Sequence, residues 1–385
     1  MRFVSKEVKI LSLAFLFIFF GYNGVQQYLT IYFSETKLFK TGFNSLVLIY
    51  LFFVLSNLLA AVFVSKYGAK KCLIFSSLFY SIFIFSLLTP SIFLIYIISA
   101  LLGMASSFLW TAQNSYLIRA SDEKSYGENA GFFSALQSLG SALGIFVLGF
   151  LIAKFSYKIP FLTFASFPLI GFLLLFKLKD LKTEKVFNRF QLLKKTVLSK
   201  TALRLSSIWF GLNFIFGLVI GIIPISIKEG LGVSFVGILS SLFFILPITL
   251  SYFFGKLSDV KGRKQMLIIS YILLLIGLAS LISQNYTLLL LGIVLLALNS
   301  AIIKPITLAL IGDVSTKENL EFLTAFLFMI QNIGVILALL LSSQLSIKMI
   351  YPISIAVTII SFLIVLPLLK LDLKEIKEKI AQEVC

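Results

Sequence analysis

The chain has 385 residues, of which 59% are apolar and only 13% charged. Soluble globular chains are about 45–50% apolar and about 25% charged, so this composition excludes an ordinary water-soluble domain. The net charge is +17 and there is no histidine. In a membrane protein basic residues orient the chain, so the excess does not predict nucleic-acid binding. The two cysteines, Cys72 and Cys385, lie far apart, so we expect no disulfide framework, no metal site and no cofactor.

Charge clusters, glycines and prolines divide the chain into twelve apolar stretches. Lipid offers backbone groups no hydrogen-bond partner, so each stretch is predicted to be a transmembrane helix. In chain order they lie near 10–33, 44–65, 72–89, 91–118, 130–153, 159–176, 203–227, 233–255, 265–283, 286–311, 322–345 and 350–369. The first stretch is longer than a signal-peptide core and lacks a small-residue cleavage pattern, so we expect it to be retained.

The basic residues fall mostly on one side of this predicted topology. The loops and tails on the side of the two termini hold 26 lysines and arginines, and the opposite loops hold six. Basic residues favour cytoplasmic loops, so both termini are predicted to be cytoplasmic in a multi-pass protein of the cell (plasma) membrane.

The longest polar segment lies between the sixth and seventh stretches. It divides the chain into an N-terminal six-helix bundle, a cytoplasmic linker, a C-terminal six-helix bundle and a cytoplasmic tail, at 1–176, 177–203, 204–370 and 371–385. In the linker, apolar residues recur at helical spacing among lysines: Val186, Phe190, Leu193 and Val197. This pattern suits a helix lying on an anionic membrane surface, and a solvated linker is the alternative.

The two halves resemble each other in sequence. An offset of 194 relates Gly68 to Gly262, Lys70 to Lys264, Gln137 to Gln331 and Gly140 to Gly334. In the first helix of each half, an offset of 190 relates Phe20, Gly21 and Asn23 to Phe210, Gly211 and Asn213. Two parallel repeats are typical of secondary transporters whose substrate site lies between the halves.

The loop after the eighth stretch carries a recognisable motif. Residues 255–264 read Gly-Lys-Leu-Ser-Asp-Val-Lys-Gly-Arg-Lys. This segment resembles the cytoplasmic-loop signature of the major facilitator superfamily. The resemblance implies an all-α membrane fold of twelve transmembrane helices in two pseudo-symmetric six-helix bundles. It also implies a gating role for Gly255, Asp259, Gly262, Arg263 and Lys264. The matching first-half loop has Ser65 in place of the acid, so it is not expected to form the same charge pair.

A second motif narrows the resemblance. The fourth stretch contains Trp110-Thr-Ala-Gln-Asn-Ser-Tyr116, which is similar to the Trp-Thr-Ala-Gln-Gly-Thr-Tyr typical of the uncoordinated-ninety-three-like branch of the superfamily. Asn114 and Ser115 depart from that pattern. The branch includes channel regulators and trafficking chaperones as well as presumed transporters, so the resemblance leaves the activity open.

Polar side chains inside spans indicate a candidate substrate site, because in lipid such groups face protein or water. The candidates are Asn23 and Gln27, which share a face with Thr30 in the first span, Trp110, Gln113 and Asn114 in the fourth, and Asn213, one turn after Trp209, in the seventh. An aromatic wall with amides suits a neutral polar solute such as a sugar or nucleoside. Hydrogen bonding between helices and aromatic packing would explain the same residues.

Lys304 is the only charged residue well inside a predicted span. An inward-facing lysine is a candidate for holding an organic anion or for titrating. Alternatively, it snorkels to the cytoplasmic interface or pairs with a carbonyl. No acidic residue lies in the middle of a span, so facilitated diffusion, or coupling through Lys304 or a carbonyl-bound ion, is favoured over carboxylate-driven symport.

No catalytic constellation is present, and we expect the protein not to be an enzyme. The sequence predicts a secondary transporter that moves a small solute through the bilayer by alternating access between two halves. The alternative is a non-transporting regulator or chaperone of another membrane protein. The sequence does not indicate an oligomeric state.

Overall fold

The computed structural model describes residues 4–35, 39–181, 188–220, 222–223, 233–283 and 285–384. In this part of the chain, twelve helices are long and apolar enough to cross a membrane. The predicted fold class and the number of spans are therefore confirmed. Several spans begin a few residues earlier than predicted: the first lies at Lys6–Leu29 and the seventh at Lys200–Val219.

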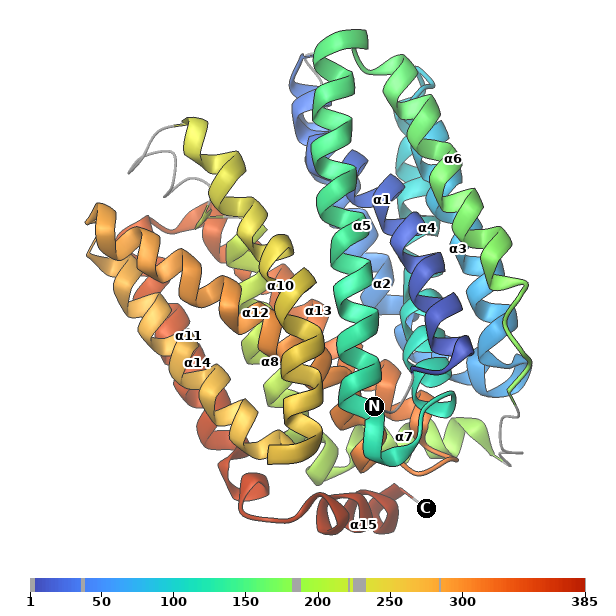
Figure 1. Cartoon of the computed structure of the whole chain (residues 1–385), viewed down its shortest axis with the longest axis vertical. Coiled ribbons are helices and arrows are strands. Elements are labelled where there is room, and N and C mark those ends of the chain that lie inside the picture. Colours follow the sequence, from blue (N-terminus) through green and yellow to red (C-terminus); the bar gives the residue numbers. More distant parts are fainter. Residues whose placement is uncertain are drawn as a thin grey trace. The chain divides into compact units, whose positions relative to one another are not determined.

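Figure 1 labels the helices. In the first part of the chain they are α1 (Lys6–Glu35), α2 (Phe39–Tyr67), α3 (Ala69–Ser86), α4 (Ile92–Arg119), the short 3-10 helix η1 (Glu123–Ser125), α5 (Tyr126–Phe155) and α6 (Lys158–Leu175). In the second part they are α7 (Arg189–Leu198), α8 (Lys200–Ile220), α10 (Val233–Lys261), α11 (Arg263–Ile282), α12 (Tyr286–Val314), α13 (Leu320–Gln344), α14 (Ile347–Leu369) and α15 (Leu373–Val384).

The chain divides into two compact units. The first comprises Met1–Ser121 and Phe133–Val186, and the second comprises Asp122–Phe132 and Phe187–Cys385. Helix α5 is thus shared, because its first turns belong to the second unit and the remainder to the first.

Helix pairing is the same in both units. In the first unit, α6 packs on α1 and α3, and α4 packs on α2 and α3. In the second unit, α14 packs on α8 and α11, and α12 packs on α10 and α11. The internal repeat read from the sequence therefore extends to the three-dimensional arrangement of helices within each unit.

The loops at the two matching glycines have nearly identical backbones. Gly68 has φ 90° and ψ 150°, and Gly262 has φ 91° and ψ 147°. A residue with a side chain rarely adopts a φ of this sign, so glycine permits the tight junction between two helices in each half. The matching conformations of Gly68 and Gly262 therefore support the offset of 194 between the two halves.

The offset of 190 for the first helices needs correction. A Cβ on Gly140 of α5 would meet the Leu16 carbonyl of α1, and a Cβ on Gly334 of α13 would meet the Phe210 carbonyl of α8. Gly140 and Gly334 differ by 194, and so do Leu16 and Phe210. The helix starts, Lys6 and Lys200, are also 194 apart. An offset of 194 therefore fits the first helices better than 190, and it matches Asn23 with Gly217 rather than with Asn213.

Two short helices, α7 and α15, do not span. In Figure 1, α15 runs across the lower end of the second unit. It buries Ile376, Ile380 and Val384 and packs against α7, α8 and α12. The predicted tail thus contains an amphipathic helix whose apolar side is covered by the protein itself.

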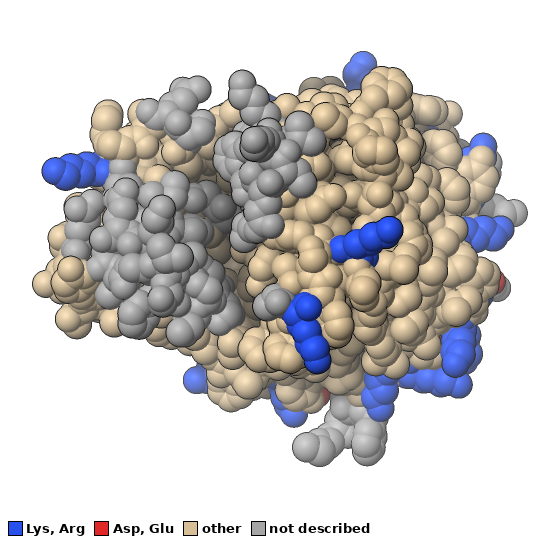
Figure 2. Space-filling model, turned by 90° about the horizontal axis from the view of Figure 1, so that it is seen from above, with Lys and Arg blue, Asp and Glu red and all other residues tan. Residues whose placement is uncertain are grey.

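The face in Figure 2 lies at the end of the first unit that carries the turn between α5 and α6. Uncharged residues make up most of this face. Lysine and arginine side chains stand apart in its middle and lie closer together along its lower right edge.

Candidate functional site

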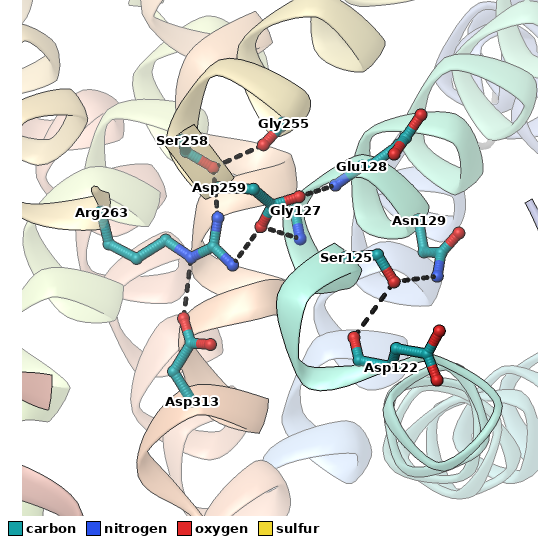
Figure 3. Close-up of polar contacts among 10 residues, drawn as sticks. All are labelled: Asp122, Ser125, Gly127, Glu128, Asn129, Gly255, Ser258, Asp259, Arg263 and Asp313. Atoms are coloured by element: carbon teal, nitrogen blue, oxygen red, sulfur yellow. Dashed lines mark hydrogen bonds and ion pairs between the residues drawn. The ribbon is translucent and has the colours of Figure 1, made fainter. Parts of the chain in front are cut away.

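Three charged side chains of the second unit form a buried cluster (Figure 3). Arg263, at the first position of α11, lies between two carboxylates: its Nη2 is 2.6 Å from Asp259 Oδ1, and its Nε donates to Asp313 Oδ2 at 2.7 Å. The Arg263 side chain is only 4% exposed. Its Nη1 also donates to Ser258 Oγ at 2.5 Å. Each of the three guanidinium nitrogens therefore has a partner, and a buried cation requires such partners. We call Asp259, Arg263 and Asp313 the charge cluster.

The charge cluster also holds the first turn of α5. Asp259 Oδ1 accepts the backbone N–H of Gly127 at 2.9 Å, and Asp259 Oδ2 accepts that of Glu128 at 2.7 Å. The first N–H groups of a helix have no partner within it, and they form the positive end of its dipole. Asp259 therefore caps α5 from another helix, through charge-assisted hydrogen bonds.

Glycines make this approach possible. A Cβ on Gly255 of α10 would lie 2.1 Å from the Gly127 carbonyl oxygen, and a Cβ on Gly127 would lie 2.3 Å from the Gly255 carbonyl oxygen. One turn further, a Cβ on Gly131 would lie 2.4 Å from the Ser251 oxygen. Any side chain at Gly127 or Gly255 would push the backbones of α5 and α10 apart.

A second set of contacts joins α5 to α10. The Tyr252 hydroxyl donates to Glu128 Oε1 at 2.6 Å, and Lys256 Nζ lies 3.9 Å from the same oxygen. Glu128 is buried, so it combines a backbone link to Asp259 with a side-chain link to α10.

Four of the five predicted gating residues take part in this arrangement. Asp259 and Arg263 form the cluster, Gly255 permits the contact with α5, and Gly262 makes the junction before α11. Lys264 is exposed and forms no ion pair with a described residue.

The sequence analysis did not predict several participants, among them Asp313, Gly127 and Glu128. A buried Arg263 needs more than one acidic neighbour, and the acid ending α12 was a signal for the second one. The α5 contribution is made by backbone N–H groups, which no side-chain pattern reveals.

The offset of 194 explains why the first half has no matching cluster. Asp259, Arg263 and Asp313 correspond to Ser65, Ala69 and Arg119. Ser65 is buried, and its hydroxyl donates to the Val62 carbonyl at 3.0 Å. The prediction that this loop forms no equivalent acid–base pair therefore has a structural reason.

In the first unit, the predicted substrate residues lie in two environments. Asn23 is half-buried and its Nδ2 donates to Ser141 Oγ at 2.7 Å, while Gln27, one turn later, is exposed. Trp110 is half-buried, with ring centroids 5.7 Å from Phe15 and 5.3 Å from Phe19. These three side chains retain accessible surface, whereas the side chain of Thr30 lies outside the described residues.

Gln113 and Asn114 are fully buried in α4. Neither Oε1 nor Nε2 of Gln113 has a hydrogen-bond partner in the structure. An amide buried without partners is costly by about 1–3 kcal/mol per group, and such groups in native proteins call for an explanation. Nearby, the Thr111 hydroxyl donates to Asn57 Oδ1 at 3.2 Å, so this stretch of α4 has a polar interior side.

In the second unit, Trp209 is 0% exposed and its indole N–H has no hydrogen-bond partner among the described residues. Half-buried Asn213 donates from Nδ2 to the Trp209 carbonyl at 3.0 Å. This bond between successive turns of α8 occupies one donor of the Asn213 amide and leaves its other groups available.

Lys304 is half-buried in α12, and its ammonium lies 5.6 Å from the centre of the Phe244 ring. It forms no ion pair with any acidic residue that the structure describes. Ring contact offers a desolvated ammonium partial compensation, so Lys304 has the properties of an intramembrane cation open to a counter-ion.

Twelve helices able to cross a membrane, arranged as two six-helix bundles with matching pairings, define an integral multi-pass membrane protein with a transporter architecture. The sequence model of the Major Facilitator Superfamily matches residues 10–222 and again residues 205–384. The chain belongs to this superfamily, whose fold and family support secondary transport in general.

Two relatives share part of the chain. UNC93-like protein MFSD11 of Xenopus tropicalis is 33% identical over 141 residues, covering 36% of this chain and 32% of the relative. UNC93-like protein 3 of Arabidopsis thaliana is 32% identical over 143 residues, covering 37% of this chain and 28% of the relative. The match therefore spans about a third of each curated relative. It confirms the resemblance to the uncoordinated-ninety-three-like branch.

A solved structure supports the fold along the whole chain. The proton:xylose symporter XylE, bound to 6-bromo-6-deoxy-D-glucose, aligns with a TM-score of 0.78 over 95% of this chain and 97% of its own, at 13% identity. At this identity the likeness concerns the fold alone.

Proposed function

We propose that this protein moves a small solute across the membrane by alternating access, and that the charge cluster stabilises one closed state on the predicted cytoplasmic side. The observation that carries the proposal is the capping of α5 by Asp259. The hydrogen bonds lie within the second unit, and the rest of α5 belongs to the first unit. We propose that they form in one transport state and break in the other.

The construction of the cluster suits a contact that forms and breaks. A buried charge pair stabilises a protein little compared with apolar side chains of the same volume, but loss of one member is costly. Such a cluster is better suited to specifying one conformation than to maximising stability. The glycines at Gly127 and Gly255 let the two backbones meet without interlocking side chains.

For the substrate we propose a neutral polar molecule, such as a sugar or nucleoside, or an organic anion. Asn23, Gln27 and Trp110 offer accessible amide and aromatic groups in the first unit. Asn213 and Lys304 offer an amide and a cation in the second. Gln113 and Asn114 are proposed as residues reached when the first unit rearranges, and the unpartnered Gln113 amide supports this role.

The domain limits at 1–176, 177–203, 204–370 and 371–385, the plasma-membrane location and the cytoplasmic position of both termini belong to this proposal. The count of basic residues supports the orientation. That the protein is a carrier and not an enzyme also belongs to this proposal, and its membership of the Major Facilitator Superfamily supports it.

The test is a thermal-shift screen of the purified protein against sugars, nucleosides, organic anions and cationic drugs, since a ligand that binds the folded state raises apparent stability. Hits are then assayed for uptake into proteoliposomes. A neutral hit supports the pocket of amides and tryptophan, whereas an anionic hit lost in Lys304→Ala makes Lys304 the counter-ion.

The second candidate function is a non-transporting regulator or chaperone of another membrane protein. The similarity to UNC93-like proteins keeps this candidate open. It predicts co-purification with a membrane partner and no thermal shift with any solute, the reverse of what transport predicts.

A further inference from the structure

Helix α7, which belongs to the second unit, has an unusual outer surface. In α7, Phe190 is 69% exposed and Leu198 is 64% exposed, and Lys194 between them is exposed as well. Residues four apart lie on one side of a helix, so the three side chains share one face. On the other side Thr196 is buried, and α7 packs against α8, α13 and α15. The helix is therefore anchored to the second unit and turns two large apolar side chains away from it.

The start of α8 also exposes an apolar and a basic residue. Leu203 is 47% exposed and Arg204 is exposed, both in the first turns of that helix. We call Phe190, Lys194, Leu198, Leu203 and Arg204 the α7 outer face. It combines three apolar residues with two cations, the composition of a helix that lies in a membrane interface.

Chain connectivity places α7 beside the membrane. Helix α8 is a candidate span beginning at Lys200, and only Ser199 separates it from the end of α7. Consecutive Cα atoms are about 3.8 Å apart, so Leu198 lies within one or two such steps of the start of the span. The end of α7 that carries exposed Leu198 is thus held close to the depth where lipid headgroups meet hydrocarbon.

Charge determines which lipid the surface suits. Helix α7 contains no acidic residue, and neither Lys194 nor Arg204 forms an ion pair with a described side chain. Lys200, by contrast, interacts with the charge of Glu383. Two uncompensated cations beside three apolar side chains match anionic phospholipid, whose headgroups attract basic residues near the membrane surface.

We propose that the α7 outer face is a binding surface for anionic phospholipid, which holds α7 at the membrane interface. The proposal does not depend on whether the protein transports a solute.

Hydrogen exchange of the full-length chain in nanodiscs tests it. Amides of residues 189–198 should exchange more slowly in phosphatidylcholine mixed with phosphatidylglycerol than in phosphatidylcholine alone. The exchange rates should differ by about fivefold for each of the two basic side chains, because one Lys or Arg near an anionic surface contributes about 1 kcal/mol. Equal exchange in the two lipids would overturn the proposal.

Two variants assign the effect to the surface. Lys194→Glu with Arg204→Glu should abolish the difference between the lipids. The matched control, Lys158→Glu with Lys348→Glu, reverses the same number of exposed charges at the starts of α6 and α14 and should keep it. The assignment is contradicted if the two lipids still give different exchange rates in Lys194→Glu with Arg204→Glu. It is also contradicted if they give equal rates in the control variant.

The apolar part has its own variant. Phe190→Ser with Leu198→Ser should speed exchange of α7 in both lipids, because its contribution does not depend on headgroup charge. Exchange of α8 in the same samples reports whether the protein is folded. If α7 exchanges at the wild-type rate in this variant, its apolar face does not contact lipid.

Discussion

Asp259 and Gly127 are 132 positions apart in the sequence, and the Asp259 carboxylate accepts the Gly127 backbone N–H at 2.9 Å. The same carboxylate accepts the Glu128 backbone N–H at 2.7 Å. Asp259, on α10, therefore caps the first turn of α5. The same carboxylate neutralises Arg263, so one side chain joins an ion pair to a helix terminus.

Asp259→Asn should weaken this contact while leaving the protein folded, because Asp313 still pairs with Arg263. We expect a loss of about 1–3 kcal/mol of stability, from a weakened cap and a less compensated buried cation. Solute uptake should fall. A cysteine at buried Ser251, introduced with Cys72→Ser and Cys385→Ser, should react faster with maleimide in the variant. Lys264→Gln, at an exposed position, should change none of these, and unchanged thiol reactivity in Asp259→Asn would refute the locking role.

Gly255→Ala tests the backbone contact without altering charge. The new Cβ would lie 2.1 Å from the Gly127 carbonyl oxygen, so α10 must move away from α5, at a cost of about 1–3 kcal/mol for overpacking. Gly277→Ala is the control, since its closest contact is 3.1 Å to the end of the Leu296 side chain. Melting temperature and uptake measure the outcome. Equal effects of the two substitutions would show that the contact is not special.

Lys304→Met should abolish uptake and leave the melting temperature unchanged or higher, because a desolvated ammonium without an acidic partner is replaced by an apolar chain of similar length. Trp110→Ala should also abolish uptake, through loss of an aromatic wall. Lys304→Arg, which keeps the charge, serves as the comparison. Normal uptake in both Lys304→Met and Trp110→Ala would remove these residues from the proposed site.

Glu383 should make stability depend on pH. Burial alone raises the pKa of this carboxyl, but hydrogen bonds from Ser199 and Thr201 and the charge of Lys200 outweigh it and hold the pKa below the ordinary value of 4.5. Ser199 Oγ donates at 2.5 Å, and Thr201 donates from N at 3.0 Å and from Oγ1 at 2.7 Å.

A depressed pKa in the folded state means that the charged form stabilises the fold. The contribution is fully present above pH 4.5 and disappears as pH falls through the lower folded value. Glu383→Gln should therefore melt at a lower temperature than the wild type at neutral pH, and the gap should close on acidification. Glu378→Gln, an exposed change on the same helix, should show no such convergence.

The class of protein follows from the sequence alone, because lipid imposes strong local rules. Each span must be apolar over its full length and must satisfy its own backbone, so twelve spans and an all-α fold were predictable. The glycine at position 262 was equally readable, since a positive φ at a tight junction excludes nearly every other residue. The two-part repeat became visible because these local requirements recur at a fixed offset.

Tertiary structure decided what each polar group does. The sequence shows which residues share a face of a helix, but not which face is buried. It therefore could not show that packing buries Gln113 completely. Similarly, the sequence placed Trp209 and Asn213 on a polar face of one helix. In the structure the Trp209 side chain is buried, and the Asn213 amide donates to the Trp209 backbone carbonyl. The partners of Arg263 come from α10 and α12, and those of Asp259 include backbone groups of α5. Such contacts depend on long-range packing geometry, which residue types and spacing do not encode position by position.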